Sequence, residues 1–157
     1  ELSMRNADRS ARTRAALMDA AQPLFARDGF AATSTDAILE GAGVKRGALY
    51  HHFTDKADLF SAVCARLSAQ AAEEVLRVAE AAPTAGAALC DGSIAWLRFM
   101  LGGEARRILA VEAPSVLGLD RWHALDQANS FQLLREGVAA AIASGDLPHH
   151  GDGELLA

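Results

Sequence analysis

The sequence predicts an all-α protein with a small N-terminal helical domain and a larger helical region behind it. Alanine is the most frequent residue and β-branched residues are sparse. This composition favours helices, because alanine loses no side-chain entropy when a helix forms. Apolar residues recur at the spacing of a helix surface, and no segment shows the alternation of a strand. With 51% hydrophobic and 22% charged residues, the chain has the composition of a globular protein.

A first helix is predicted from Ser10 to Arg27, with Gly29 after its end. Glycine suits the left-handed backbone position that follows many helices. We expect residues 1–10 to form a disordered tail, in which Glu1-Leu2-Ser3 ahead of Met4 are left over from expression. The apolar residues of this helix define one face, at i, i+3, i+4, i+7 and i+8: Leu17, Ala20, Ala21, Leu24 and Phe25.

Two short helices and a long one are predicted next. Hydroxyl and carboxylate side chains at positions 33–36 are typical N-caps, and they predict a second helix to about Glu40. The Gly41-Ala42-Gly43 turn separates it from a third helix at positions 44–52. Thr54-Asp55 then predicts the cap of a long fourth helix, which Pro83 ends.

Three more helices are predicted in the second half of the chain. The fifth has an apolar stripe from Leu89 to Leu101 and ends at Gly102-Gly103. The sixth covers positions 104–112 and is stopped by Pro114, and the seventh runs from Asp120 to Ser144 and ends at Gly145. We place the boundary between two domains near residue 56, with one domain at 11–56 and a second at 57–157.

The second and third helices have the features of a helix-turn-helix, which needs two short helices, a small turn and apolar residues that fix the crossing angle. Ile38 and Ala42 can pack against Val44, Leu49 and Phe53 of the following helix. Leu49 and Phe53 are four residues apart, so both face the core. The residues that then point outward are small, aromatic or cationic, as suits a helix in a DNA major groove: Lys45, Arg46, Gly47, Ala48, Tyr50 and His51.

Three runs of this segment resemble, in order and spacing, the headpiece of the tetracycline-repressor (TetR) family of bacterial transcription regulators. They are Phe30-Ala31-Ala32-Thr33-Ser34-Thr35-Asp36-Ala37-Ile38, then Ala42-Gly43-Val44-Lys45-Arg46-Gly47-Ala48-Leu49-Tyr50-His51-His52-Phe53, then Lys56-Ala57-Asp58-Leu59. Residues 11–60 carry the resemblance. A single short motif would match many proteins, whereas these three runs in this order are specific for the family headpiece. The resemblance implies a DNA-binding domain at 11–56 and a ligand-binding and dimerisation domain at 57–157. It also implies a homodimer that binds a palindromic operator in double-stranded DNA.

The resemblance also implies roles for single residues. Tyr50, His52 and Lys56 match positions that bind phosphates, Ser34 and Thr35 match hydroxyls that anchor the second helix to the DNA backbone, and positions matching Arg46, Gly47 and Ala48 approach base edges. The family usually has a small hydroxyl residue where Lys45 stands, and often another where Ala48 stands, so the operator sequence cannot be copied from a relative. The predicted DNA-binding residues are Thr33, Ser34, Thr35, Lys45, Arg46, Gly47, Ala48, Tyr50, His51, His52 and Lys56.

Alternatives remain for several of these residues. Tyr50 could pack on its own headpiece, His51 and His52 could be solvated, and Lys56 could be an ordinary exposed lysine. The net charge of −5 does not favour nucleic acid, although residues 1–60 hold eight basic and eight acidic side chains and both lysines of the chain. A neutral headpiece can still bind phosphates if its positive charges share one face.

Behind the headpiece, large apolar side chains and a few polar ones predict a pocket for a small, apolar inducer. The stretch from Arg107 to Gly118 also resembles the sensor region of one TetR subgroup. The alternative is a plain helical core with a solvated polar face. The candidate pocket residues are Trp96, Phe99, Met100, Glu112, Leu117, Trp122, His123 and Phe131.

No motif predicts an enzyme, a cofactor or a metal site. Gly-x-Ser-x-Gly, a phosphate-binding glycine loop and His-Glu-x-x-His are all absent from the sequence. His123, Asp126 and Glu112 fall short of a di-iron site, and His149-His150 lies in a tail where solvated histidines are expected. We expect Cys64 and Cys90 to be buried thiols in a reducing cytoplasm. No apolar run reaches the roughly 20 residues of a membrane span.

The sequence therefore predicts a cytoplasmic, homodimeric repressor that a small apolar ligand releases from DNA. A TetR-like activator is one alternative, and a helical small-molecule-binding module that no longer binds DNA is another. Ala48 and the acidic net charge favour this module mildly, whereas Tyr50 and Lys56 oppose it. The stretch from Gly145 to Ala157 resembles the connector that precedes a final pair of dimer-forming helices in relatives, so we expect those helices to be missing.

Overall fold

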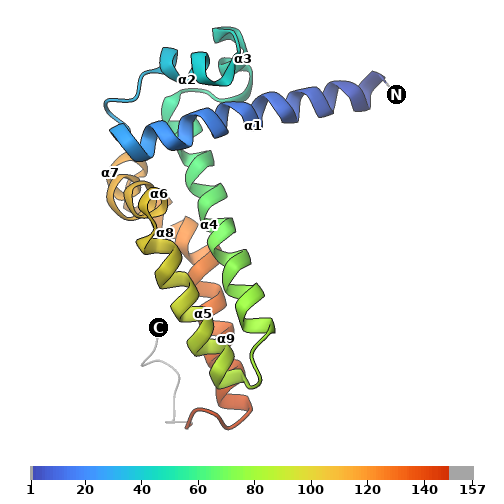
Figure 1. Cartoon of the computed structure of the whole chain (residues 1–157), viewed down its shortest axis with the longest axis vertical. Coiled ribbons are helices and arrows are strands. Elements are labelled where there is room, and N and C mark those ends of the chain that lie inside the picture. Colours follow the sequence, from blue (N-terminus) through green and yellow to red (C-terminus); the bar gives the residue numbers. More distant parts are fainter. Residues whose placement is uncertain (1, 149–157) are drawn as a thin grey trace. The chain divides into compact units, whose positions relative to one another are not determined.

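The computed structural model describes residues 2–148, apart from the side chains of residues 2–6 and 128 (Figure 1). The predicted all-α class is confirmed, since all regular structure in this part of the chain is helical. His149-His150 lies outside the described residues. The elements are α1 (Leu2–Asp28), α2 (Thr35–Ala42), α3 (Arg46–His52), α4 (Lys56–Glu80), α5 (Ala85–Leu101), α6 (Gly103–Ala105), the π-helix η1 (Arg106–Glu112), α7 (Ala113–Leu117), α8 (Leu119–Asp126), the π-helix η2 (Gln127–Phe131) and α9 (Gln132–Ala143).

The chain forms two compact units. Among the described residues, unit 1 consists of 2–67 together with 100–123, and unit 2 consists of 68–99 together with 124–148. The boundary predicted near residue 56 therefore falls inside unit 1. The reason is that α6 and η1, although distant in sequence, pack against α1 and complete the core of the N-terminal unit.

The first helix is longer than predicted. α1 begins at Leu2, so residues 2–10 are helical where we expected a disordered tail. Leucine, methionine, arginine and alanine, which are good helix formers, occupy much of this stretch and extend the helix. Pro23 lies inside α1 on an exposed position.

The core of unit 1 is built around three phenylalanines. The ring of Phe25 lies 5.0 Å from that of Phe60 in an edge-on arrangement, and Phe30 lies 5.3 Å from Phe60. Edge-on aromatic pairs at this separation add to the stabilisation that burial gives. The same core contains buried aliphatic side chains from five elements, as the apolar stripes predict: Leu17, Ala21, Ile38, Leu49, Leu59, Val63 and Ile108.

The predicted helix-turn-helix is present in unit 1, where α2 and α3 pack against α1 (Figure 1). The Ser34 hydroxyl accepts a hydrogen bond from the Ala37 N–H at 3.1 Å and caps α2. Gly43 ends α2 with φ = +65°, a left-handed conformation that glycine adopts without strain. Ile38, Leu49 and Phe53 are buried, which confirms the packing predicted from their spacing.

The segment 103–117 differs from its prediction. Helical structure runs through η1 to Glu112 and continues into α7, so the prediction that Pro114 stops the helix is wrong. In η1 the hydrogen-bond register shifts, because the Ala113 N–H bonds to the Ile108 carbonyl five residues back. Pro114 then lies in the first turn of α7, where its missing N–H is tolerated. Gly118, with φ = +78°, ends the segment.

Unit 2 contains the second half of α4, most of α5, η2 and α9. A Cβ atom on Gly92 would lie 3.2 Å from the Val75 side chain, and one on Gly137 would lie 3.2 Å from Leu89. These glycines therefore let α5 approach α4 and α9 closely. The predicted seventh helix corresponds to α8, η2 and α9, which follow one another without a break up to Ala143.

The two cysteines differ in their surroundings. Cys64 is buried in α4, and burial raises the pKa of its thiol to about 12. Such a thiol is inert at neutral pH. Cys90 is exposed, so the prediction that both thiols are buried is wrong for this residue. α5 buries Gly92 and Ala95, and Cys90 falls on another face of that helix.

Candidate nucleic-acid interface

Most of the predicted DNA-facing residues at α3 are exposed to solvent, whereas Ala48 is half-buried. Lys45, Arg46, Gly47 and His51 are exposed, and the Tyr50 side chain is 54% exposed. A Cβ atom on Gly47 would meet nothing within 4 Å, so the surface at this position is open. Lys45 occupies the N-cap position of α3 without a side-chain hydrogen bond to the helix.

Arg46 has a partner that the sequence analysis did not predict. Its guanidinium bonds to the Asp36 carboxylate of α2 at 2.6 Å, and both side chains are exposed. Exposed ion pairs contribute about 0–1 kcal/mol, so this contact can be exchanged for another acceptor at small cost. Arg46 therefore lies at the exposed end of α3 and can still reach a base or a phosphate.

Lys56 lies in the first turn of α4, as predicted, and its ammonium already binds two backbone groups. Nζ donates to the Phe30 and Thr33 carbonyl oxygens, both at 2.8 Å, and lies 4.4 Å from the centre of the Phe30 ring. An ammonium has three N–H donors, so one remains. The first turn of a helix also carries unpaired backbone N–H groups, and these favour an anion.

The three hydroxyl residues around the start of α2 do not share one environment. Ser34 is exposed and Thr35 is half-buried, whereas Thr33 is 2% exposed. The Thr33 hydroxyl donates to the Gly29 carbonyl at 2.8 Å. We therefore correct the placement of Thr33, because burial and this hydrogen bond make it a residue of the turn between α1 and α2.

The end of α3 is held by α1. The Arg14 guanidinium lies 5.1 Å from the centre of the Phe53 ring, a cation–π contact that the sequence analysis missed. Arg14 lies outside the helix-turn-helix, and helical spacing alone does not reveal such a contact. Desolvation, and then the charges of His51 and Arg14, lowers the pKa of the half-buried His52.

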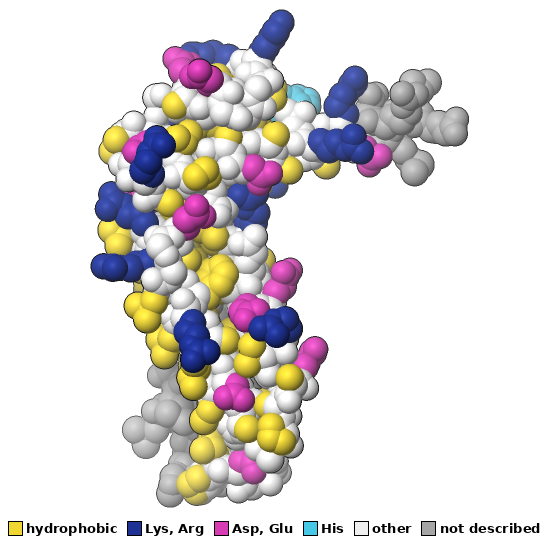
Figure 2. All heavy atoms as spheres, in the orientation of Figure 1, with side chains coloured by type: hydrophobic (Ala, Val, Ile, Leu, Met, Phe, Trp, Pro, Cys, Tyr) yellow, Lys and Arg dark blue, Asp and Glu magenta, His cyan; other side chains and the backbone are white. Residues whose placement is uncertain are grey.

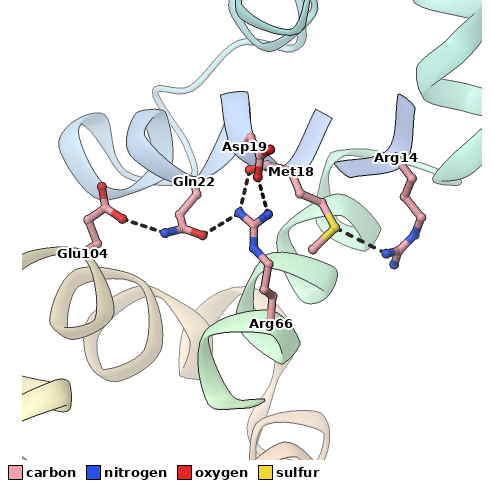
Figure 3. Close-up of polar contacts among 6 residues, drawn as sticks. All are labelled: Arg14, Met18, Asp19, Gln22, Arg66 and Glu104. Atoms are coloured by element: carbon pink, nitrogen blue, oxygen red, sulfur yellow. Dashed lines mark hydrogen bonds and ion pairs between the residues drawn. The ribbon is translucent and has the colours of Figure 1, made fainter. Parts of the chain in front are cut away.

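Polar side chains also tie α1 to α4 and α6 (Figure 3). Arg66 of α4 donates to Asp19 at 2.5 Å, to the Gln22 side chain at 2.6 Å and to the Met18 carbonyl at 3.1 Å. Gln22 in turn donates to Glu104 of α6 at 2.7 Å. The helix that supports α2 and α3 is thus fixed at its middle by a connected set of hydrogen bonds.

A cavity of about 670 Å³ lies within unit 2. Trp96 and Phe131 line it, together with aliphatic residues of α4, α5 and α9. The Trp96 indole N–H donates to the Ser130 hydroxyl at 2.9 Å, which fixes the orientation of the ring. Uncovered apolar side chains occur along the helices of this unit on the face shown in Figure 2, and the exposed Leu76, Leu97 and Leu134 belong to the cavity lining.

Six of the eight candidate pocket residues do not line this cavity: Phe99, Met100, Glu112, Leu117, Trp122 and His123. All of them except Phe99 belong to unit 1. The Trp122 indole N–H donates to the Leu109 carbonyl at 3.2 Å, and Leu117 is buried in the unit 1 core. Glu112 pairs with Arg107 at 3.0 Å and accepts a hydrogen bond from the Phe30 N–H at 3.3 Å.

Two negative findings apply to residues 2–148. His, Cys, Asp and Glu side chains do not gather there in groups of three that could hold a metal ion. None of the helices of this stretch combines the length and the apolar character needed to cross a bilayer.

An all-helical chain with an exposed recognition helix, a supporting α1 and a separate helical unit defines a helix-turn-helix DNA-binding protein. Comparisons with known proteins identify the protein family. Residues 17–63 match the tetR family of bacterial regulatory proteins, and residues 86–157 match the tetracyclin repressor-like C-terminal domain. The chain belongs to the tetR family. The members of this family are transcription regulators, so membership agrees with the prediction that the chain is not an enzyme.

Individual relatives share mainly the N-terminal part. The HTH-type transcriptional regulator AcrR of Shigella flexneri is 49% identical over 51 residues, which are 32% of this chain and 24% of that protein. The HTH-type transcriptional repressor AcnR of Corynebacterium glutamicum is 32% identical over 74 residues, 47% of this chain and 39% of the repressor. The matched segments thus span well under half the length of these relatives.

Solved structures extend the likeness to both units. A TetR-family transcriptional regulator from Pectobacterium atrosepticum is 29% identical, with a TM-score of 0.66 over 88% of this chain and 79% of that chain. A TetR-family regulator from Marinobacter aquaeolei VT8 has a TM-score of 0.71 at 22% identity, over 90% of this chain and 75% of that chain. At 22% identity, the similarity to the Marinobacter aquaeolei VT8 regulator shows a shared fold alone.

Proposed function

We propose that the chain is a transcriptional repressor that binds a palindromic DNA operator through α3 and the turn before α2. The observation that carries the proposal is the division of α3 into two faces. Leu49 is buried in the core, while Lys45, Arg46 and Gly47 are exposed at the beginning of the helix. A helix that presents cationic and small residues in this way suits a major groove. The name of the Corynebacterium relative supports repression over activation.

The proposed protein acts as a homodimer. One headpiece offers only a short recognition helix and few cationic side chains, and specific DNA binding usually needs two half-sites. For a twofold pair of helix-turn-helix units, half-site centres are expected roughly 34–36 Å apart or at a multiple of that distance. The proposed inducer is a small, largely apolar molecule that fits the cavity of unit 2.

The test begins with DNA fragments that the full-length protein selects from its source genome. Operator titrations at several salt concentrations then compare two variants with the wild type. Arg46→Ala should relax base preference at one operator position by about 1–3 kcal/mol if Arg46 forms a bidentate contact. Lys56→Ala should weaken binding to all sequences and lower the log–log salt slope by about one unit per headpiece.

Arg77→Ala is the control, since Arg77 is an exposed cation of unit 2 that pairs with Glu74. It should leave operator affinity and salt slope unchanged. If Arg46→Ala and Lys56→Ala also behaved as the wild type, DNA binding through α3 would be wrong. A protein that bound apolar small molecules but selected no DNA would support the stand-alone binding module.

A further inference from the structure

Glu112 contacts the turn between α1 and α2 from a distant part of the sequence. Its side chain is 17% exposed, and one carboxylate oxygen accepts the Phe30 N–H at 3.3 Å while the other pairs with Arg107 at 3.0 Å. Phe30 lies 82 residues before Glu112 in the chain. The last residue of η1 is therefore a direct partner of the turn that leads into the helix-turn-helix.

Gly29 shows how closely this carboxylate approaches the turn. A Cβ atom at Gly29 would lie 2.8 Å from Glu112 Oε1 and 2.9 Å from Arg107 Nη2, and the residue has φ = +81°. Both the space and the backbone conformation require glycine here. The Glu112–Arg107 pair is thus packed against the backbone of the turn.

Lys56 holds the same turn from α4. Its two hydrogen bonds end on the Phe30 and Thr33 carbonyl oxygens, so the N–H and the C=O of Phe30 are bound by charged side chains from two different elements. The residue after Thr33 is Ser34, the cap of α2. A turn fixed in this way sets both the start of α2 and the direction of the remaining Lys56 donor.

We propose that Glu112 is a positioning residue for DNA binding: it holds the 29–33 turn so that Ser34, Thr35 and Lys56 can contact phosphates together. The segment 103–117 thereby acts on the DNA-binding surface without touching DNA. This inference rests on the proposed function, because it assigns Glu112 a role in operator binding. A π-helix is an uncommon element that often occurs at functional sites, and η1 ends at this carboxylate.

Two substitutions separate the hydrogen bond from the side-chain volume. Glu112→Gln keeps an acceptor for the Phe30 N–H and loses the charge, whereas Glu112→Met keeps the length and loses the acceptor. A typical protein hydrogen bond corresponds to about a 2- to 10-fold change in an equilibrium constant. We expect Glu112→Met to weaken operator binding by about this factor with an unchanged salt slope, and Glu112→Gln to restore most of the affinity.

Glu104→Met is the matched control, because Glu104 belongs to the same segment and contacts the middle of α1 through Gln22 (Figure 3). It should leave operator affinity unchanged. Hydrogen exchange supplies a readout that needs no DNA: the Phe30 amide should exchange faster in Glu112→Met and at the wild-type rate in Glu104→Met.

Several results would overturn the proposal. One is a Glu112→Met variant with the operator affinity and the Phe30 amide exchange of the wild type. Another is a Glu104→Met variant that loses as much operator affinity as Glu112→Met, because this would show that a general loosening of α1 is responsible. A wild-type protein that selects no operator contradicts the proposed function, and Phe30 exchange still reports whether Glu112 positions the turn.

Discussion

At the scale of single residues, two of the cations predicted to bind DNA, Arg46 and Lys56, are already engaged within the chain. Arg46 bonds to Asp36, and Lys56 bonds to two carbonyl oxygens. The sequence predicted which side chains face outward, since exposure follows from helical spacing. It could not predict these partners, because they depend on the crossing of α2, α3 and α4. The proposed DNA binding at these positions would therefore exchange one set of contacts for another.

The Arg46–Asp36 pair gives a first prediction. Asp36→Asn removes a negative charge from the DNA-facing side and frees the guanidinium. Because an exposed pair contributes up to about 1 kcal/mol, affinity for DNA of any sequence should rise by up to about fivefold. Titrations of unrelated duplexes measure it, with Asp91→Asn, an exposed acid of α5, as the control. Unchanged or weaker binding by Asp36→Asn would contradict the idea that Asp36 restrains Arg46.

His52 gives a pH prediction. Desolvation, with His51 and Arg14, lowers its pKa below the usual 6.5, so the free protein carries a neutral imidazole at pH 7. A phosphate favours the imidazolium, and operator binding through His52 should therefore take up a proton and strengthen as the pH falls from 7.5 to about 5.5. The effect on folding has the opposite sign: a lowered pKa in the folded state makes the protein less stable as the pH falls through the ordinary histidine range.

The measurement is operator affinity across this pH range, in the wild type and in His52→Asn. The variant should show a smaller dependence on pH, with thermal unfolding at each pH as the folding control. Identical pH profiles for the two proteins would remove His52 from the phosphate-binding residues.

At the scale of elements, helical periodicity and capping residues predicted most of the helices, because these signals lie within a few residues of one another. The start of α2 follows from Ser34, and its end from Gly43. The π-helices were not predicted, since a one-residue shift of hydrogen bonds leaves no distinctive residue pattern. Pro114 shows the consequence: a residue that normally ends a helix begins α7 after such a shift.

The hydrogen bonds of Arg66 give a prediction at this scale. Its side chain is 25% exposed, and it holds α4 to α1 through Asp19, Gln22 and the Met18 carbonyl. Arg66→Met keeps the aliphatic stem but leaves these groups without their donor. The free energy of unfolding should fall by about 1–3 kcal/mol.

Arg77→Met is the matched control, because the Arg77–Glu74 pair is exposed and joins residues of one helix. Its free energy of unfolding should change by less than about 0.5 kcal/mol. Urea unfolding of the wild type, Arg66→Met and Arg77→Met, monitored by the loss of helicity, tests both expectations. Equal stability of Arg66→Met and the wild type would mean that solvent replaces the Arg66 contacts without loss.

At the scale of the whole molecule, the existence of a second helical region behind the headpiece could be predicted, but the position of its cavity could not. Large apolar side chains fill the cores of both units, and the sequence does not say which of them border empty space. Trp96 and Phe131 line the cavity, whereas Trp122 belongs to unit 1. The candidate site thus depends on which helices pair within each unit, and this is a property of the folded chain.

The last prediction concerns coupling between ligand and DNA. α4 carries Lys56 in unit 1 and contributes Ala72 and Val75 to the cavity of unit 2, so one continuous helix belongs to both proposed sites. A shared element of this kind is the physical requirement for coupling. If a ligand weakens operator binding tenfold, linkage requires that it bind the DNA complex about 1.4 kcal/mol more weakly than the free protein.

Substitutions of Trp96 and Trp122 test this prediction, because only Trp96 lines the cavity. A compound that stabilises the protein in a thermal screen is titrated against the operator complex of the wild type, Trp96→Ala and Trp122→Ala. Trp96→Ala should remove most of the ligand's effect on operator affinity, while affinity without ligand stays near wild type. Trp122→Ala loses a hydrogen bond to Leu109 within unit 1 and should be less stable, yet it should respond to ligand as the wild type does. A response lost in Trp122→Ala and kept in Trp96→Ala would move the ligand site out of unit 2. A ligand that binds tightly to all three proteins without changing operator affinity would show that the two units are not coupled.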